Sequence, residues 1–152
     1  MSADPADIRN FVRLSDSLTT SGRLQRSDPA RLAAMGVRHV INLALPDHPD
    51  ALPDAAEAMA AAGLAYTHIP VPFNAPTLDH YRAFKAALEA EHTPAHVHCI
   101  MNWRVSAFMC RWHREQGMAD DAAAELMHLV WQPETSDYPH AEKWAAIALG
   151  RD

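Results

Sequence analysis

The most informative stretch of this chain runs from Ala95 to Ser106 and reads AHVHCIMNWRVS. Its first four residues predict a short strand that ends directly before Cys99. Apolar side chains then recur at the spacing of an amphipathic helix; they are Val105, Phe108, Met109 and Trp112. The sequence therefore places Cys99 in a loop between the end of a strand and the N-terminus of a helix.

Outward from this stretch, segments typical of strands alternate with segments typical of helices. Strands are predicted at 11–14, 18–21, 37–45 and 65–71, and helices at 27–35, 51–62, after Thr77, at 119–131 and at 139–149. This alternation predicts an α/β fold, a single domain whose central sheet is mostly parallel and is flanked by helices. Residues 11–152 should form this domain, preceded by a flexible N-terminal arm at residues 1–10.

The composition suits one globular domain and excludes several classes of protein. The chain has 152 residues, of which 49% are hydrophobic and 21% charged, close to the average for globular domains. It has no apolar run long enough to span a bilayer and no secretory signal at its start, so we expect a cytoplasmic protein without a membrane partner. A net charge of -6 argues against a nucleic-acid partner. Any anionic ligand needs a local positive site.

The chemistry-bearing residues lie in the loop after the predicted strand. A helix N-terminus offers unpaired N–H groups and a partial positive charge, and these stabilise a thiolate at Cys99. Arg104 carries a planar guanidinium group that matches two oxygens of a phosphate or of a sulfur oxyanion. A nucleophile, backbone donors and a cationic clamp together suit attack on phosphorus or on sulfane sulfur. The second cysteine, Cys110, falls on the predicted helix and is expected to be a core residue.

The segment His98–Ser106 resembles the active-site loop of cysteine-dependent phosphatases, in which His-Cys is followed by a short loop, an Arg and a Ser or Thr. From about residue 10 to 116, the chain is similar to small bacterial phosphatase-like proteins near the dual-specificity protein tyrosine phosphatases, in particular the beta-lactamase-hydrolase-like branch. Further matching segments are Leu18–Gly22, Gly36–Leu43 and His68–Val71. The resemblance implies a tyrosine-phosphatase-like architecture and hydrolysis of a phosphate monoester.

The resemblance also implies a role for each residue of the loop. Cys99 would attack phosphorus and form a cysteinyl-phosphate, Arg104 would bind the phosphate, and His98 would orient the loop and tune Cys99. Ser106 would assist when the thiolate leaves. The phosphate-binding N–H groups would be those of Ile100, Met101, Asn102, Trp103 and Arg104. The substrate would be a phosphorylated protein or small molecule, with no cofactor. No metal site is expected, because the histidines do not occur at zinc-ligand spacing.

Two alternatives follow from departures from the phosphatase pattern. Four residues separate Cys99 from Arg104, as in rhodanese-type sulfurtransferases, which carry sulfur as a cysteine persulfide. The loop Val71–Pro76, where such phosphatases place a general acid, has Asn74 and no carboxylate, which favours a phosphate- or anion-binding module without turnover. Asp79 and His80 follow this loop closely, where a carboxylate at a helix start is more often a capping charge. The position of Asp47, His48 and Asp50 after the first long strand would allow them to reach the same face. In addition, Asn102 stands where the related loops have glycine, and asparagine tolerates a left-handed backbone.

Overall fold

The structure, a computed structural model, describes residues 4–90 and 94–151. The strands are β1 (Val12–Ser15), β2 (Leu18–Ser21), β3 (His39–Asn42), β4 (Ala65–His68) and β5 (Ala95–His98). The helices are α1 (Asp28–Ala34), α2 (Ala55–Ala61), α3 (Leu78–Ala90), α4 (Trp103–Glu115), α5 (Asp120–His128) and α6 (Ala141–Ala148). Every predicted strand and helix is present, but several are shorter than the sequence patterns that predicted them.

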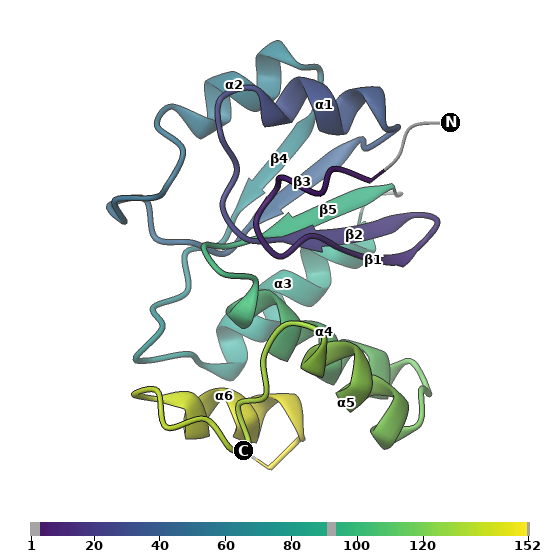
Figure 1. Cartoon of the computed structure of the whole chain (residues 1–152), viewed down its shortest axis with the longest axis vertical. Coiled ribbons are helices and arrows are strands. Elements are labelled where there is room, and N and C mark those ends of the chain that lie inside the picture. Colours follow the sequence, from purple (N-terminus) through teal and green to yellow (C-terminus); the bar gives the residue numbers. More distant parts are fainter. Residues whose placement is uncertain (1–3, 91–93, 152) are drawn as a thin grey trace.

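The five strands form one sheet in the order β1-β2-β5-β3-β4. β1 pairs antiparallel with β2, and the other neighbours pair in parallel. The predicted α/β fold with a mostly parallel sheet is therefore confirmed. The last residues of β2 and β3, Ser21 and Asn42, both pair with His98 at the end of β5. The loops after these strands consequently leave the sheet at one edge (Figure 1).

Helices cover both faces of the sheet (Figure 1). α1 and α2 pack on one face, and α3 to α6 lie on the other. Neighbouring residues of β3 serve the two cores, because side chains alternate along a strand: Val40 belongs to the core under α1 and α2, and Ile41 to the larger core under the other helices. All four residues of β3 are buried, as expected for a strand of a parallel sheet that helices cover on both faces.

The long apolar patterns of β3 and β4 extend beyond the strands because the chain leaves the sheet at polar and proline residues. The side chain of Asn42 accepts a hydrogen bond from the N–H of Ala44 at 2.8 Å, which bends the backbone away from the ladder. Pro46 and Pro70 lack the N–H that a strand would need. No helix among residues 4–90 and 94–151 is both long and apolar enough to cross a membrane.

Candidate active site

The Cys99 loop joins the central strand β5 to helix α4. Cys99 follows directly on β5 and is almost fully buried. Asn102, at the N-terminal boundary of α4, has the left-handed φ of 68° that the loop needs in order to turn into the helix. Its side-chain amide donates to the carbonyl oxygen of Asn10 at 2.9 Å and to Oγ1 of Thr20 at 3.1 Å. The strained backbone of this non-glycine residue is therefore held by contacts from the first hairpin and the segment before it.

The segment before β1 and the end of β2 hold the loop from the outside. The carbonyl oxygen of Ile100 accepts a hydrogen bond from the N–H of Arg23 at 2.9 Å. Gly22 is required at this contact, since a Cβ at Gly22 would collide with the Ile100 carbonyl oxygen. Asn10 donates from its side chain to the Met101 carbonyl oxygen at 2.9 Å. The predicted flexible arm lies partly outside the described residues; within the described part, Ile8 is buried in the core under α1 and α2.

Arg104 lies in the first turn of α4, with only 8% of its surface exposed. Its Nε and Nη1 atoms are buried and have no hydrogen-bond partner among the described residues. The guanidinium carbon lies 5.7 Å from the centre of the Phe73 ring. A buried charge without a partner is costly, because water no longer solvates it. An oxyanion beside Cys99 would supply the missing partner.

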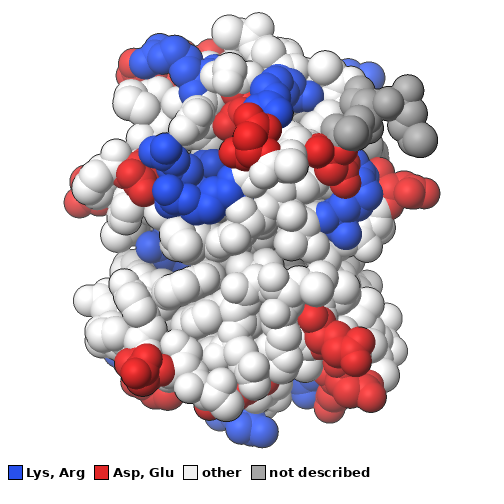
Figure 2. Space-filling view, viewed as in Figure 1, with Lys and Arg blue, Asp and Glu red and all other residues white. Residues whose placement is uncertain are grey.

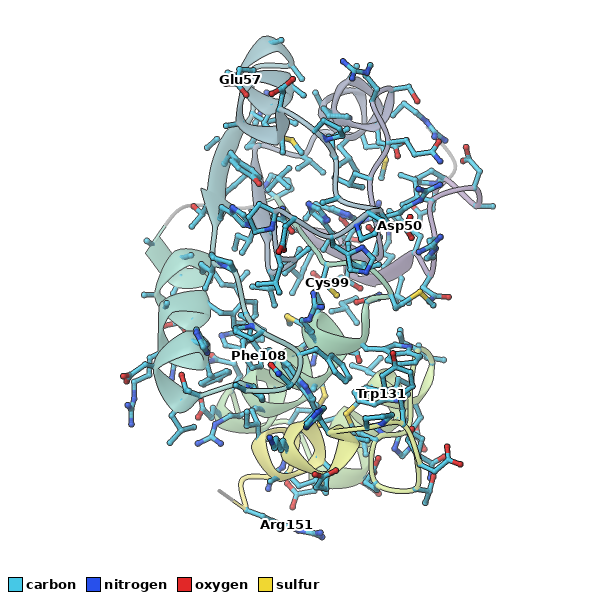
Figure 3. The ribbon with its side chains drawn as sticks, turned by 90° about the vertical axis from the view of Figure 1, so that its left-hand side faces the viewer. Asp50, Glu57, Cys99, Phe108, Trp131 and Arg151 are labelled. Atoms are coloured by element: carbon cyan, nitrogen blue, oxygen red, sulfur yellow. The ribbon has the colours of Figure 1, made fainter. Side chains whose placement is uncertain are left out.

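Cys99 and Arg104 open into one pocket of about 240 Å³. Its lining residues are His48, Phe73, Cys99, Ile100, Met101, Trp103, Arg104 and Tyr138. They come from the loops after β3, β4 and β5, from the start of α4, and from the segment between α5 and α6. Figure 3 shows Cys99 between the sheet side, where Asp50 lies, and the helical side, where Trp131 lies. Most of the predicted loop residues thus meet in one pocket; His98, Asn102 and Ser106 support the loop without lining it.

One side of the pocket is a wall of stacked aromatic rings. The rings of Trp103 and Trp131 stack with centres 4.8 Å apart. Phe73 and Tyr138 meet edge to face at 5.6 Å. The sequence analysis missed Phe73 and Tyr138; the signal for Phe73 was its place as the single aromatic residue of the proline-rich loop. Figure 2 shows an uncharged surface over the centre of the helical half, whereas charged side chains of both signs lie over the sheet half.

His98 lies beneath the loop and is held neutral by burial. Its Nδ1 lies 3.3 Å from the carbonyl oxygen of Cys99, to which it donates. Burial, together with a smaller effect of the nearby His68, lowers the pKa of His98 to about 4. Its neighbour His96 bonds Oγ1 of Thr19 and Oγ of Ser21, both at 2.8 Å, and burial holds the pKa of His96 well below its usual value. Both histidines are thus neutral at pH 7, and the proposed tuning of Cys99 by His98 stays a prediction.

The structure does not bring Ser106 to the pocket. Its hydroxyl donates to the carbonyl oxygen of Trp103 at 2.9 Å. Ser106 instead lines a small cavity on the other side of α4, together with Cys110 and His113. Burial raises the pKa of the Cys110 thiol to about 11, so this cysteine is a poor nucleophile. Cys99 is therefore the cysteine that faces a ligand, and the assisting role expected of Ser106 has no support from its position.

Two of the carboxylates considered as general acids, Asp50 and Asp79, form ion pairs with arginine side chains. Asp50 is held by Arg9 at 3.2 Å and by Arg23 at 3.5 Å. Asp79 is exposed and pairs with Arg82 at 3.0 Å. None of the residues that line the pocket is a carboxylate, and the one titratable residue there besides Cys99, Arg104 and Tyr138 is His48. No cluster of three or more metal-ligating side chains occurs in the described part of the chain.

Comparison with known proteins gave a phosphatase-like family and solved structures of phosphatases or phosphatase-like proteins. Residues 8–119 match the family model for the beta-lactamase hydrolase-like protein, phosphatase-like domain. The DUF442 protein of Shewanella putrefaciens CN-32 has 28% identity and a TM-score of 0.81, with 95% of this chain and 91% of that chain covered. P. aeruginosa TpbA in complex with phosphotyrosine has 20% identity and a TM-score of 0.67, with 99% and 93% covered. The catalytic domain of the S. cerevisiae PP-IP phosphatase SIW14 in complex with citrate has 11% identity and a TM-score of 0.69, with 94% and 87% covered. Comparison with curated protein sequences gave no match.

Proposed function

Since the chain belongs to the family of the beta-lactamase hydrolase-like protein, phosphatase-like domain, as its motifs predicted, we propose that it hydrolyses a phosphate monoester through a cysteinyl-phosphate on Cys99. The observation that carries this proposal is that Cys99 and Arg104 line the same pocket, while the buried Nε and Nη1 atoms of Arg104 have no hydrogen-bond partner among the described residues. A phosphoryl group at Cys99 would bring two oxygens to these donors.

In the proposed reaction, the thiolate of Cys99 attacks phosphorus and forms an S–P bond. The P–O bond to the leaving group breaks, and its electron pair goes to the leaving oxygen. Arg104 and the N–H groups at the start of α4 hold the phosphoryl oxygens, because the first N–H groups of a helix have no partner within it. Water then attacks phosphorus, releasing phosphate and restoring the thiolate.

The pocket favours an aryl phosphate as substrate. Phe73, Trp103 and Tyr138 form an aromatic wall next to the phosphoryl position, against which the ring of an aryl phosphate can pack. A phenolate also leaves more readily than an alkoxide, which suits a pocket without a carboxylic acid. The phosphotyrosine bound by TpbA, a relative in fold, belongs to the same chemical class. We therefore propose phosphatase activity of the tyrosine or dual-specificity type. The cytoplasmic location stays a prediction.

A second candidate is sulfur transfer, which the four-residue loop and the lack of a carboxylate in the pocket lining both favour. The Cys99 thiolate would attack the sulfane sulfur of thiosulfate, forming a persulfide while the bond to sulfite breaks. Sulfite departs as a stable anion, so no group has to donate a proton. Under this alternative Arg104 would bind the sulfonate oxygens instead of phosphate.

The test compares hydrolysis of p-nitrophenyl phosphate by the wild type, Cys99→Ser and Cys110→Ser. We expect turnover in the wild type and in Cys110→Ser and none in Cys99→Ser, because the second cysteine lies outside the pocket. Arg104→Lys should lower kcat/KM by about 100-fold or more, since an ammonium group cannot bind two oxygens as a planar fork does. Release of sulfite from thiosulfate by a wild type that leaves phosphate esters intact would favour the second candidate. Absence of both reactions would leave only anion binding.

A further inference from the structure

We propose that His48 donates a hydrogen bond from Nε2 to the leaving-group oxygen of the substrate and so stabilises this oxygen as it departs, in a pocket whose lining residues include no carboxylic acid. The inference rests on the proposed phosphatase function and adds to it a residue that touches the reacting atoms. It is carried by the position of His48 in the wall of the Cys99 pocket and by a contact that fixes the tautomer of its ring.

His48 reaches the pocket from the loop between β3 and α2. The backbone N–H of His48 donates to the carbonyl oxygen of Leu45 at 3.3 Å, and its own carbonyl accepts from Ala51 at 3.0 Å. These bonds fold the loop into consecutive turns at the carboxyl end of β3. Because β3 is the direct neighbour of β5, the turns lie beside the Cys99 loop. His48 thus lines the same pocket as Cys99 and Arg104.

The tautomer follows from one hydrogen bond. The backbone N–H of Asp50 lies 3.0 Å from Nδ1 of His48. A backbone N–H can only donate, so Nδ1 is the acceptor and carries no proton. The ring proton of the neutral imidazole is therefore on Nε2. No described residue makes a hydrogen bond to Nε2, and Nε2 is not fully buried. It is an available donor on a residue of the pocket wall.

The loop that carries His48 is tied to the Cys99 loop. Asp50, whose N–H fixes the ring, also accepts ion pairs from Arg9 and Arg23. Arg9 in turn reaches the carbonyl oxygen of Ile100 at 3.5 Å. Figure 3 shows Asp50 close to Cys99 on the sheet side of the pocket. Asp50 is thereby engaged twice through its carboxylate, and its backbone N–H makes it a positioning residue for His48.

The donor would act while the P–O bond breaks. As Cys99 forms its bond to phosphorus, the electron pair of the breaking bond moves onto the leaving oxygen. The Nε2–H group of neutral His48 stabilises this growing negative charge by a hydrogen bond. The leaving group departs as an anion and takes its proton from water. A neutral donor is worth most for a leaving group that is basic and least for one that is already stable as an anion.

The test uses two substitutions of His48, each of which keeps the hydrogen-bonding function of only one ring nitrogen. In His48→Asn the side-chain oxygen still accepts from the Asp50 N–H, but no donor remains at the ε position. In His48→Gln an amide N–H is kept near that position. We expect His48→Asn to lower kcat/KM for phenyl phosphate by about 100-fold, and for 2,4-dinitrophenyl phosphate by less than about threefold, whereas His48→Gln recovers most of the phenyl phosphate activity.

Asp47→Asn is the matched control, because Asp47 is the exposed neighbour of His48 and should change neither rate. A loss in His48→Asn that is equal for both esters, or no loss at all, would overturn the inference while the proposed function stands. Failure of the proposed function is recognised separately, because the wild type would then hydrolyse even 2,4-dinitrophenyl phosphate no faster than Cys99→Ser. That result would also overturn the role of His48.

Discussion

The guanidinium group of Arg104 is positively charged, yet two of its nitrogen atoms have no hydrogen-bond acceptor among the described residues. Stability alone would select against such an arrangement, since replacing a buried unpaired charge with an apolar side chain removes its desolvation cost. A ligand that supplies the missing acceptors explains why the charge is there. The same reasoning applies to the left-handed backbone of Asn102, whose strain would shape the loop around such a ligand.

The buried histidine His98 makes the stability of the protein depend on pH. Its pKa of about 4 in the folded chain lies below the value of about 6.5 expected after unfolding. Between these values the unfolded chain binds the extra proton, so the free energy of unfolding falls as the pH drops from about 6.5 to about 4. The contribution of His98 over this window is about 3 kcal/mol.

Urea denaturation at several pH values measures this dependence. His98→Gln should show a shallower loss of stability on acidification than the wild type, because its side chain does not titrate. The slope should not vanish, since burial also lowers the pKa of His96 and His113. Equal slopes in the two proteins would contradict the role assigned to His98.

Helix α6 fixes the loop between β4 and α3 as a rigid wall of the pocket. The indole N–H of Trp144 donates to the carbonyl oxygen of Phe73 at 2.8 Å, and the two rings stack at 5.6 Å. Lys143 donates to the carbonyl oxygen of Asn74 at 2.7 Å. The helix therefore holds the segment where related phosphatases carry their acid, and in this chain Phe73 of that segment lines the pocket.

Trp144→Phe should weaken both the fold and the pocket wall. The change leaves a cavity and removes the partner of the Phe73 carbonyl, so the free energy of unfolding should fall by about 2 to 4 kcal/mol. KM for an aryl phosphate should rise several-fold, because Phe73 loses its support. Lys143→Met is the control at the exposed tether and should cost less than about 1 kcal/mol. Thermal unfolding and steady-state kinetics check both variants; an equal effect of the two changes would contradict the account.

Over the whole molecule, the features that local sequence patterns determine were predicted, whereas contacts between segments distant in the sequence were not. Cys99 and Arg104 were predicted because the strand, the loop and the helix that hold them are contiguous in sequence. His48 was named as near the same face, but its entry into the pocket depends on β3 lying next to β5, a strand order that no local pattern specifies. Tyr138 reaches the pocket only through the packing of the last two helices. The role of Ser106 was predicted from the resemblance to the phosphatase loop, yet its hydroxyl bonds to the carbonyl oxygen of Trp103 in the first turn of α4.

The central claim is a phosphoryl group carried on Cys99. Wild-type protein mixed with p-nitrophenyl phosphate and quenched in acid within a single turnover should contain the added mass of one phosphoryl group on the peptide that includes Cys99. Cys110→Ser should show the same adduct, and Cys99→Ser should show none. Turnover without any adduct on Cys99, or an adduct on another residue, would contradict the account.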